Sequence, residues 1–328
     1  MKKFVVILLL YSSAFINHGM KLAEFEDIYK PSQIVVSGND IYVVDGETIK
    51  LFSIKNMELK KMIGEKGEGP GEFKMAPTIQ LFPDLIFVSD YGKILYFKRN
   101  GKFIYEKKIS TDINLEKVQD NYLSARDDYR MDKGVVISTF SILDKNFNEF
   151  KTLYSTSREF KISYGADKKR DMKLFEKVKQ SFTDGEYIYV TDTHKGFYFE
   201  ILDHTGKLLN TVNRKTKKIR ISNKYKKDFM TELQESSDWI KWGSRYNHIF
   251  PEYFPAFSHL EGDKNRIYVY SQVDNNKNAR LTIFDRRGNF QKMISIPRGD
   301  RSTVNNEKFY YMIENEDDEV WELHSVDL

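Results

Sequence analysis

The side chains that most often carry out chemistry are widely separated in this sequence. Beyond residue 19 its histidines are His194, His204, His248, His259 and His324, and no pair has the spacing of two metal ligands on one helix. Cysteine is absent, which excludes disulfides, thiolate metal sites and a cysteine nucleophile. The Gly-x-Ser-x-Gly turn of many hydrolases is also absent. These observations predict no catalytic residue, no bound metal and no cofactor.

One segment is unusually rich in aromatic residues and contains two of the three tryptophans. Rigid aromatic rings beside an arginine and a histidine are typical of sites that hold a sugar or a peptide. We therefore predict a ligand-binding site formed by Trp239, Trp242, Arg245, Tyr246 and His248. The alternative is that these rings only pack this segment onto the rest of the protein.

A lysine-rich stretch precedes the aromatic segment, at Lys215, Lys217, Lys218, Arg220, Lys224, Lys226 and Lys227. Ser222 is suited to cap a helix whose apolar residues, Tyr225, Phe229, Leu233 and Ile240, recur near helical spacing. The lysines could bind phosphate or an anionic polymer, or they could form a solvated helix face. We favour the solvated face and predict no nucleic-acid partner, because the export signal at residues 1–19 argues against one. The 52 Lys and Arg are also nearly balanced by 48 Asp and Glu.

The elements that position these residues follow a repeat. An apolar strand ending in a polar residue recurs at Ile41–Asp45, Ile86–Asp90, Ile188–Asp192 and Ile267–Ser271, with a weaker copy at Phe309–Met312. Downstream, a tight turn recurs at Lys98–Lys102, Asp203–Lys207 and Asp285–Asn289, each with a glycine at its fourth residue. Together they predict a four-stranded antiparallel sheet repeated along the chain.

Six such units account for residues 20–328 and predict one all-β domain, a six-bladed β-propeller. Blade 1 comprises Gln33–Val36, Ile41–Val44, Thr48–Ile54 and Leu59–Ile63, and the next four blades span 78–109, 115–154, 178–212 and 257–296. The sixth blade lacks an outer strand, so we predict that Leu22–Ile28 closes the ring. The helical and aromatic segment is an insertion between blades 4 and 5, and Ser155–Glu176 is predicted to be a mobile surface excursion.

The connection Gly64–Phe73, which is followed by Pro77, resembles the link between blades in NHL-repeat propellers. So do the strands that end in an aspartate and are followed by an isoleucine, at Asp45 with Ile49 and at Asp90 with Ile94. The chain thus resembles an exported bacterial member of the six-bladed NHL-like group. This resemblance implies the fold and no particular activity. Some six-bladed relatives are metal-dependent lyases or lactonases whose ligands come from separate blades.

Asp45, Asp90 and Asp192 end equivalent strands. Carboxylates that converge on the ring axis could hold calcium. Because the aspartate is repeated from blade to blade, we predict instead a structural bond from each side chain to the backbone.

Residues 1–19 have the features of a signal peptide, with Lys2 and Lys3 before a short apolar run, Phe4–Leu10. An uncleaved membrane anchor is the alternative. We predict a monomeric protein in the periplasm or secreted, with no membrane span in the mature chain. Its predicted function is non-catalytic binding of a glycan, a peptide or an envelope protein. The alternatives are a metal-dependent lyase or lactonase with its site in the central channel, and a structural component of an envelope complex.

Overall fold

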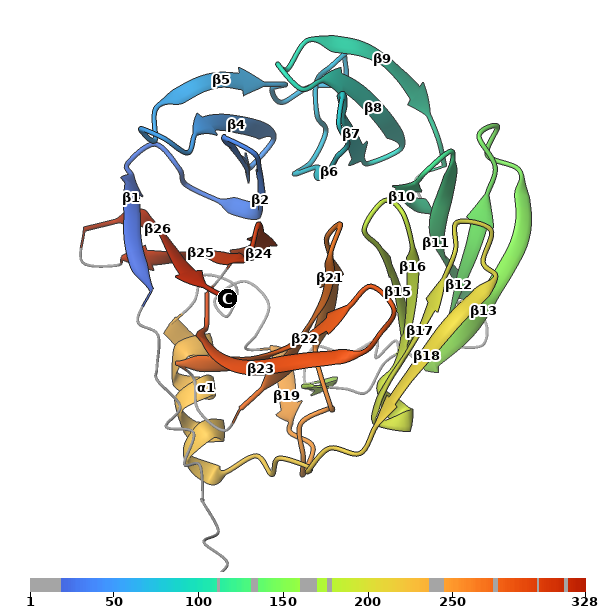
Figure 1. Cartoon of the computed structure of the whole chain (residues 1–328), viewed down its shortest axis with the longest axis vertical. Helices are drawn as coiled ribbons and strands as arrows, with labels where there is room; N and C mark the ends of the chain where they lie inside the picture. Colours follow the sequence, from blue (N-terminus) through green and yellow to red (C-terminus); the bar gives the residue numbers. More distant parts are fainter. Residues whose placement is uncertain are drawn as a thin grey trace, which may run out of the picture.

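The structure is a computed structural model that describes residues 19–110, 113–130, 135–159, 170–175, 179–235, 245–273, 277–299, 301–315 and 318–328. Six four-stranded antiparallel sheets surround a central axis, as Figure 1 shows. This arrangement confirms the predicted six-bladed β-propeller. Residues 1–18, nearly all of the predicted signal peptide, lie outside the described residues. Among the residues that the structure describes, no helix has both the length and the apolar character that a membrane crossing needs.

The strands of blades 1 to 3 follow the predicted order. Blade 1 contains β2 (Pro31–Ser37), β3 (Asp40–Asp45), β4 (Thr48–Ser53) and β5 (Leu59–Ile63). Blade 2 contains β6 (Thr78–Leu81), β7 (Leu85–Asp90), β8 (Lys93–Lys98) and β9 (Phe103–Lys108). Blade 3, the least regular repeat in the sequence, contains β10 (Ile113–Val118), β11 (Asn121–Arg130), β12 (Val135–Leu143) and β13 (Glu149–Glu159).

Blades 4 to 6 complete the ring. Blade 4 contains β15 (Lys179–Thr183), β16 (Ile188–Asp192), β17 (Phe197–Leu202) and β18 (Leu208–Arg214). Blade 5 contains β20 (His259–Gly262), β21 (Arg266–Gln272), β22 (Asn278–Asp285) and β23 (Phe290–Pro297). Blade 6 contains β24 (Arg301–Asn305), β25 (Lys308–Asn315), β26 (Val320–Asp327) and, as its outer strand, β1 (Met20–Phe25).

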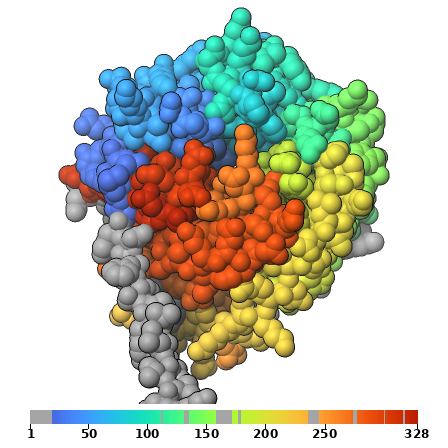
Figure 2. All heavy atoms as spheres, viewed as in Figure 1, coloured from blue at the N-terminus to red at the C-terminus, as the bar shows by residue number. Residues whose placement is uncertain are grey.

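The outer strand of blade 6 comes from the opposite end of the chain. Strand β1 pairs antiparallel with β26, so that Met20 faces Ser325 and Phe25 faces Trp321. Figure 2 shows the blue N-terminal residues packed beside the red C-terminal ones. The pairing confirms that an N-terminal strand closes the propeller. It covers an edge of β26 that would otherwise expose unpaired backbone groups.

The core lies between neighbouring blades, which explains why the second strand of each repeat is apolar on both faces. In β3, Tyr42 and Val44 pack toward blade 2, while Ile41 and Val43 pack toward blade 6. The repeated aspartates are structural, as predicted. Asp45 accepts hydrogen bonds from the backbone N–H groups of the connection that enters its own blade, and Asp90 does the same in blade 2.

The insertion between blades 4 and 5 contains helix α1 (Asn223–Glu235), which the sequence predicts from its spacing. The Ser222 hydroxyl accepts a hydrogen bond from the Tyr225 N–H at 3.0 Å and so caps the helix. Tyr225 is buried against Ile221 and Phe254. The helix is therefore anchored by its own first turn and by the chain that follows it.

The segment Ser155–Glu176 differs from the predicted mobile excursion over its described residues. Its first five residues extend β13 of blade 3, and Arg170–Lys173 form β14, which pairs in parallel with β19 (Tyr246–Ile249) of the other insertion. Phe175 packs beside Tyr225 and Phe254. The two insertions therefore hold each other, a long-range contact that local spacing does not reveal.

Candidate functional site

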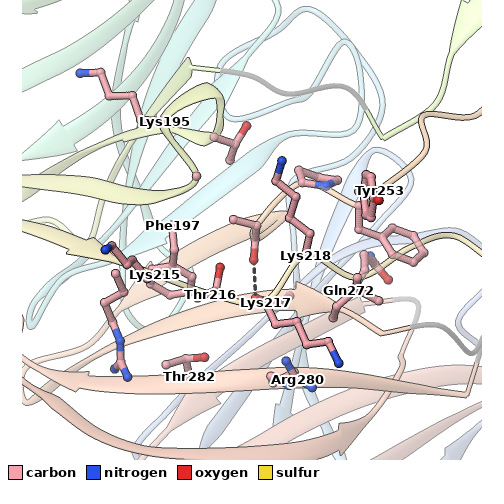
Figure 3. A pocket seen from close by; sticks show the side chains of 18 of the residues that line it. Lys195, Phe197, Lys215, Thr216, Lys217, Lys218, Tyr253, Gln272, Arg280 and Thr282 are labelled. Atoms are coloured by element: carbon pink, nitrogen blue, oxygen red, sulfur yellow. Dashed lines mark hydrogen bonds between the residues drawn. The ribbon is translucent and has the colours of Figure 1, made fainter.

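A cavity of ≈ 710 Å³ opens between blades 4 and 5, at the end of the sheets where β16 turns into β17. Its wall combines this turn, the segment that follows β18, residues 251–256 and the facing ends of β21 and β22. In Figure 3, Lys215, Lys217 and Lys218 surround the space, while Arg280 and Thr282 project from β22. The volume falls in the range of ligand sites in proteins, about 300–1,000 Å³.

The wall of the cavity is strongly cationic. It contains one carboxylate, Glu252, and six Lys or Arg side chains, namely Lys195, Arg214, Lys215, Lys217, Lys218 and Arg280. Glu252 lies 3.6 Å from the guanidinium of Arg220, which therefore offsets its charge. Within the described part of the chain, no ion pair joins Arg280 or the three lysines of the 215–218 segment to a carboxylate. Because the whole chain is close to neutral, this concentration of charge is local.

The local sequence fixes two parts of this wall. Asp192 caps a short 3₁₀ turn, Thr193–Lys195, by accepting a hydrogen bond from the His194 N–H, and Gly196 follows with a φ of 91° that glycine adopts without strain. On the other side, residues 219–221 run antiparallel to 252–254. The buried Ile221 and Phe254 hold this short ribbon on α1 and keep the lysines before it at the cavity.

Two buried polar atoms in the wall lack a hydrogen-bond partner among the described residues. One is Nη1 of Arg214, whose guanidinium lies 3.9 Å from the ring centre of Phe290. The other is the amide oxygen of Gln272. An unsatisfied buried polar group costs about 1–3 kcal/mol, so such groups in native proteins usually have a further role. Both side chains belong to residues that line the cavity, so its wall contains one donor and one acceptor without a partner.

None of the predicted site residues that the structure describes lines this cavity. Trp239 and Trp242 are outside the described residues. Arg245 is exposed at the start of β19, and Tyr246 and His248 lie on that strand beside β14; none of the three lines the cavity. Of the other aromatic residues in that segment, Phe250 and Phe254 pack around α1, and Phe257 packs against Phe197 in the core.

The lysine-rich stretch was predicted to be solvated, and Lys224 and Lys227 are indeed exposed on α1. Lys215, Lys217 and Lys218 are exposed as well, but they lie before the helix, at the cavity. The sequence of a single repeat does not reveal this site, because Lys195 comes from blade 4 and Arg280 from blade 5.

The central channel has a different character. The first strand of each blade lies nearest the axis (Figure 1), and several polar side chains there bond to the backbone of the next blade. The Gln33 amide accepts from the Ile79 N–H at 2.8 Å and donates to its carbonyl at 2.9 Å. Gln80 bonds in the same way to Lys117, and Glu116 accepts from the Thr183 N–H at 3.2 Å. These contacts tie neighbouring blades together.

Two inner-strand carboxyls titrate unusually. Burial raises the pKa of Glu116 to about 7, although its bond from Thr183 opposes the change. Burial likewise raises the pKa of Glu261 to about 7. Among the described residues, no group of three or more His, Asp or Glu side chains is arranged to hold a metal ion.

We expect Glu116→Gln and Glu261→Gln each to stabilise the protein at pH 8 and to have little effect at pH 4. The folded protein holds these protons up to about pH 7, whereas the unfolded chain releases them near pH 4.5. Wild-type stability therefore falls as the pH rises through this interval, and each glutamine removes about 1–3 kcal/mol of that loss. Urea unfolding at both pH values measures the effect.

The control is Glu235→Gln at the exposed end of α1, which should give the wild-type pH profile. Equal gains at pH 4 and pH 8 would show that packing, and not ionisation, accounts for the change.

The fold and the cavity together define the chain as a six-bladed β-propeller with a cationic cavity between two blades. Residues 24–175 match the family DUF5128, described as a 6-bladed beta-propeller. No curated protein matches the sequence. Among solved structures, the Neurospora crassa Pan2 WD40 domain is 12% identical with a TM-score of 0.39, and the match covers 89% of this chain and 74% of that one.

Two further structures are similar at this level. The AfRom2 CNH domain is 10% identical with a TM-score of 0.44, and the match covers 95% of this chain and 99% of that one. The Pyrococcus horikoshii acylaminoacyl peptidase is 12% identical with a TM-score of 0.42. That match covers 88% of this chain and 43% of the peptidase, so this chain corresponds to less than half of that enzyme.

Proposed function

We propose that this chain is an exported, non-catalytic recognition propeller that binds an anionic ligand in the cavity between blades 4 and 5. The observation that carries the proposal is the charge of the wall, which contains six Lys or Arg side chains and one carboxylate, Glu252, that Arg220 offsets. Of the six, Lys195 lies 3.8 Å from Asp192, and the other five have no ion pair among the described residues. Cations held together in a cleft raise the local concentration of anions and speed their association. Export rests on the sequence of residues 1–19.

The aromatic segment that the sequence singles out belongs to this proposal as a neighbouring element. Residues 251–254 form part of the cavity wall, and Lys218 lies 5.7 Å from the ring centre of Tyr253. Tyr246 and His248 precede this stretch on β19. We propose that Trp239, Trp242, Arg245, Tyr246 and His248 contact those parts of a ligand that extend out of the cavity.

Replacing both Lys217 and Lys218 by serine should weaken anion binding about 10-fold or more at low salt while leaving the fold intact. Both side chains are exposed, and surface substitutions usually change stability by less than about 0.5 kcal/mol. Isothermal titration with a galacturonate hexamer, inorganic polyphosphate and a hexaglutamate peptide measures the change.

The matched control is Lys61→Ser with Lys108→Ser, which removes the same charge from the outer strands of blades 1 and 2. Equal losses in the two double variants would show that net charge alone attracts the anion, and the cavity would lose its assignment. Mass spectrometry of the hexamer after incubation with stoichiometric protein tests the absence of catalysis, since shortened products would contradict it.

A further inference from the structure

The chemistry of the cavity narrows the class of anion that fits it. The unpartnered Nη1 of Arg214 needs an acceptor, while the unpartnered amide oxygen of Gln272 needs a donor. A phosphate diester or a polyphosphate offers acceptors only. A sugar acid carries a carboxylate and hydroxyl groups on one ring, so it offers an acceptor and a donor together.

Other residues of the wall suit the same class. Thr216 adds an exposed hydroxyl, and the half-buried Tyr253 adds an aromatic ring. Aromatic rings pack against the apolar faces of sugars, while hydroxyl and amide side chains fix their orientation. The Lys and Arg side chains of the wall then pair with the carboxylate of the sugar acid.

The cationic surface also continues beyond the cavity. Lys224 and Lys227 are exposed on the first turns of α1, and the first turn contains no acidic residue. Lys224 is six positions after Lys218, so their backbones are at most about 22 Å apart. A single sugar would leave this track unused, whereas a chain of sugars would follow it.

On the basis of the function proposed above, we propose that the ligand is an acidic polysaccharide. One sugar acid binds between Arg214 and Gln272, and the chain continues over the ribbon toward Lys224 and Lys227. Binding is then strongest for oligomers, because each added acidic sugar meets a further cation.

Titration calorimetry at one fixed ionic strength tests this inference. The probes are monomers and hexamers of galacturonate and of mannuronate, a neutral galactose hexamer, inorganic polyphosphate, hexaglutamate and a DNA oligonucleotide. We expect one of the acidic hexamers to bind at least 10-fold tighter than its monomer and than every other probe, and the neutral hexamer to bind weakest.

Two variants separate the parts of the inference. Gln272→Ala should weaken hexamer binding about 10-fold and leave polyphosphate binding unchanged, because polyphosphate has no donor for the Gln272 oxygen. The double variant Lys224→Ser with Lys227→Ser should weaken the hexamer and spare the monomer. Both lysines are exposed, so this variant tests the track even if Gln272→Ala proves unstable.

The failures are distinguishable. Binding of polyphosphate, hexaglutamate or DNA as tight as that of the acidic hexamers would overturn the sugar class and leave the anion-binding function standing. A hexamer that binds no tighter than its monomer would overturn the inference that the ligand is a polymer. Absence of binding by every probe would overturn both the polysaccharide and the anion-binding function.

Discussion

Replacing Phe25 by alanine is expected to lower the free energy of unfolding by about 3–5 kcal/mol, the usual range for a buried phenylalanine. Phe25 ends the closing strand β1, is 4% exposed, and packs 4.6 Å from the ring centre of Phe52 in blade 1. It also faces Trp321 of β26. The side chain thus joins the first and last blades, and its loss weakens the closure of the ring. Urea unfolding followed by tryptophan fluorescence measures the effect.

Met20→Ala provides the control at the other end of β1, because Met20 is 60% exposed and should cost little. A loss below about 1 kcal/mol for Phe25→Ala would show that β1 contributes little to closure, whatever its pairing.

Arg286→Met should be comparably destabilising, at about 3–5 kcal/mol, because it leaves a buried carboxylate without its cation. Arg286 lies in the turn between β22 and β23 and pairs with Asp184, whose side chain is 2% exposed in the turn between β15 and β16. It also donates to the Asp263 carbonyl at 2.6 Å and to the Tyr189 hydroxyl at 3.0 Å. These bonds clamp blades 4 and 5 at the end of the sheets opposite the cavity.

The neighbouring Arg287 is exposed, so Arg287→Met is the matched control and should stay within about 0.5 kcal/mol of wild type. Adding Asp184→Asn to Arg286→Met should recover part of the lost stability, because the uncompensated charge is then removed. A double variant no more stable than Arg286→Met would show that packing of the arginine, and not the ion pair, holds the two blades.

The sequence predicts the fold well because each repeat can be recognised from neighbouring residues, namely an apolar strand followed by a tight turn. An apolar run such as Ile41–Val44 must be buried on both faces, and a turn such as Asp203–Lys207 forces a hairpin. Even the closure follows from the count of strands, since the sixth blade lacks one. The pairing of β14 with β19 could not be predicted, because it joins two short segments from different insertions whose composition carries no strand signal.

The candidate site was harder to predict for a related reason. Its wall takes Lys195 from one turn, Arg280 from the next blade and Lys217 from a connection, and no spacing within one repeat links them. The aromatic residues drew attention because they are dense in sequence, yet Phe250, Phe254 and Phe257 proved to be packing residues. The contacts that Gln33, Gln80 and Glu116 make between blades could not be predicted either. In the sequence, a polar residue on an inner strand does not differ from one that is exposed to solvent.

The pairing of β1 with β26 has a consequence for biosynthesis. Met20 leaves the ribosome long before Ser325, its partner; at about 5–20 residues per second the wait is about 15–60 s. Until then Phe25 has no Trp321 to pack on, and the edge of blade 1 lacks its final neighbour. The ring therefore closes only when synthesis is nearly finished, and the first blade waits without its last neighbour until then.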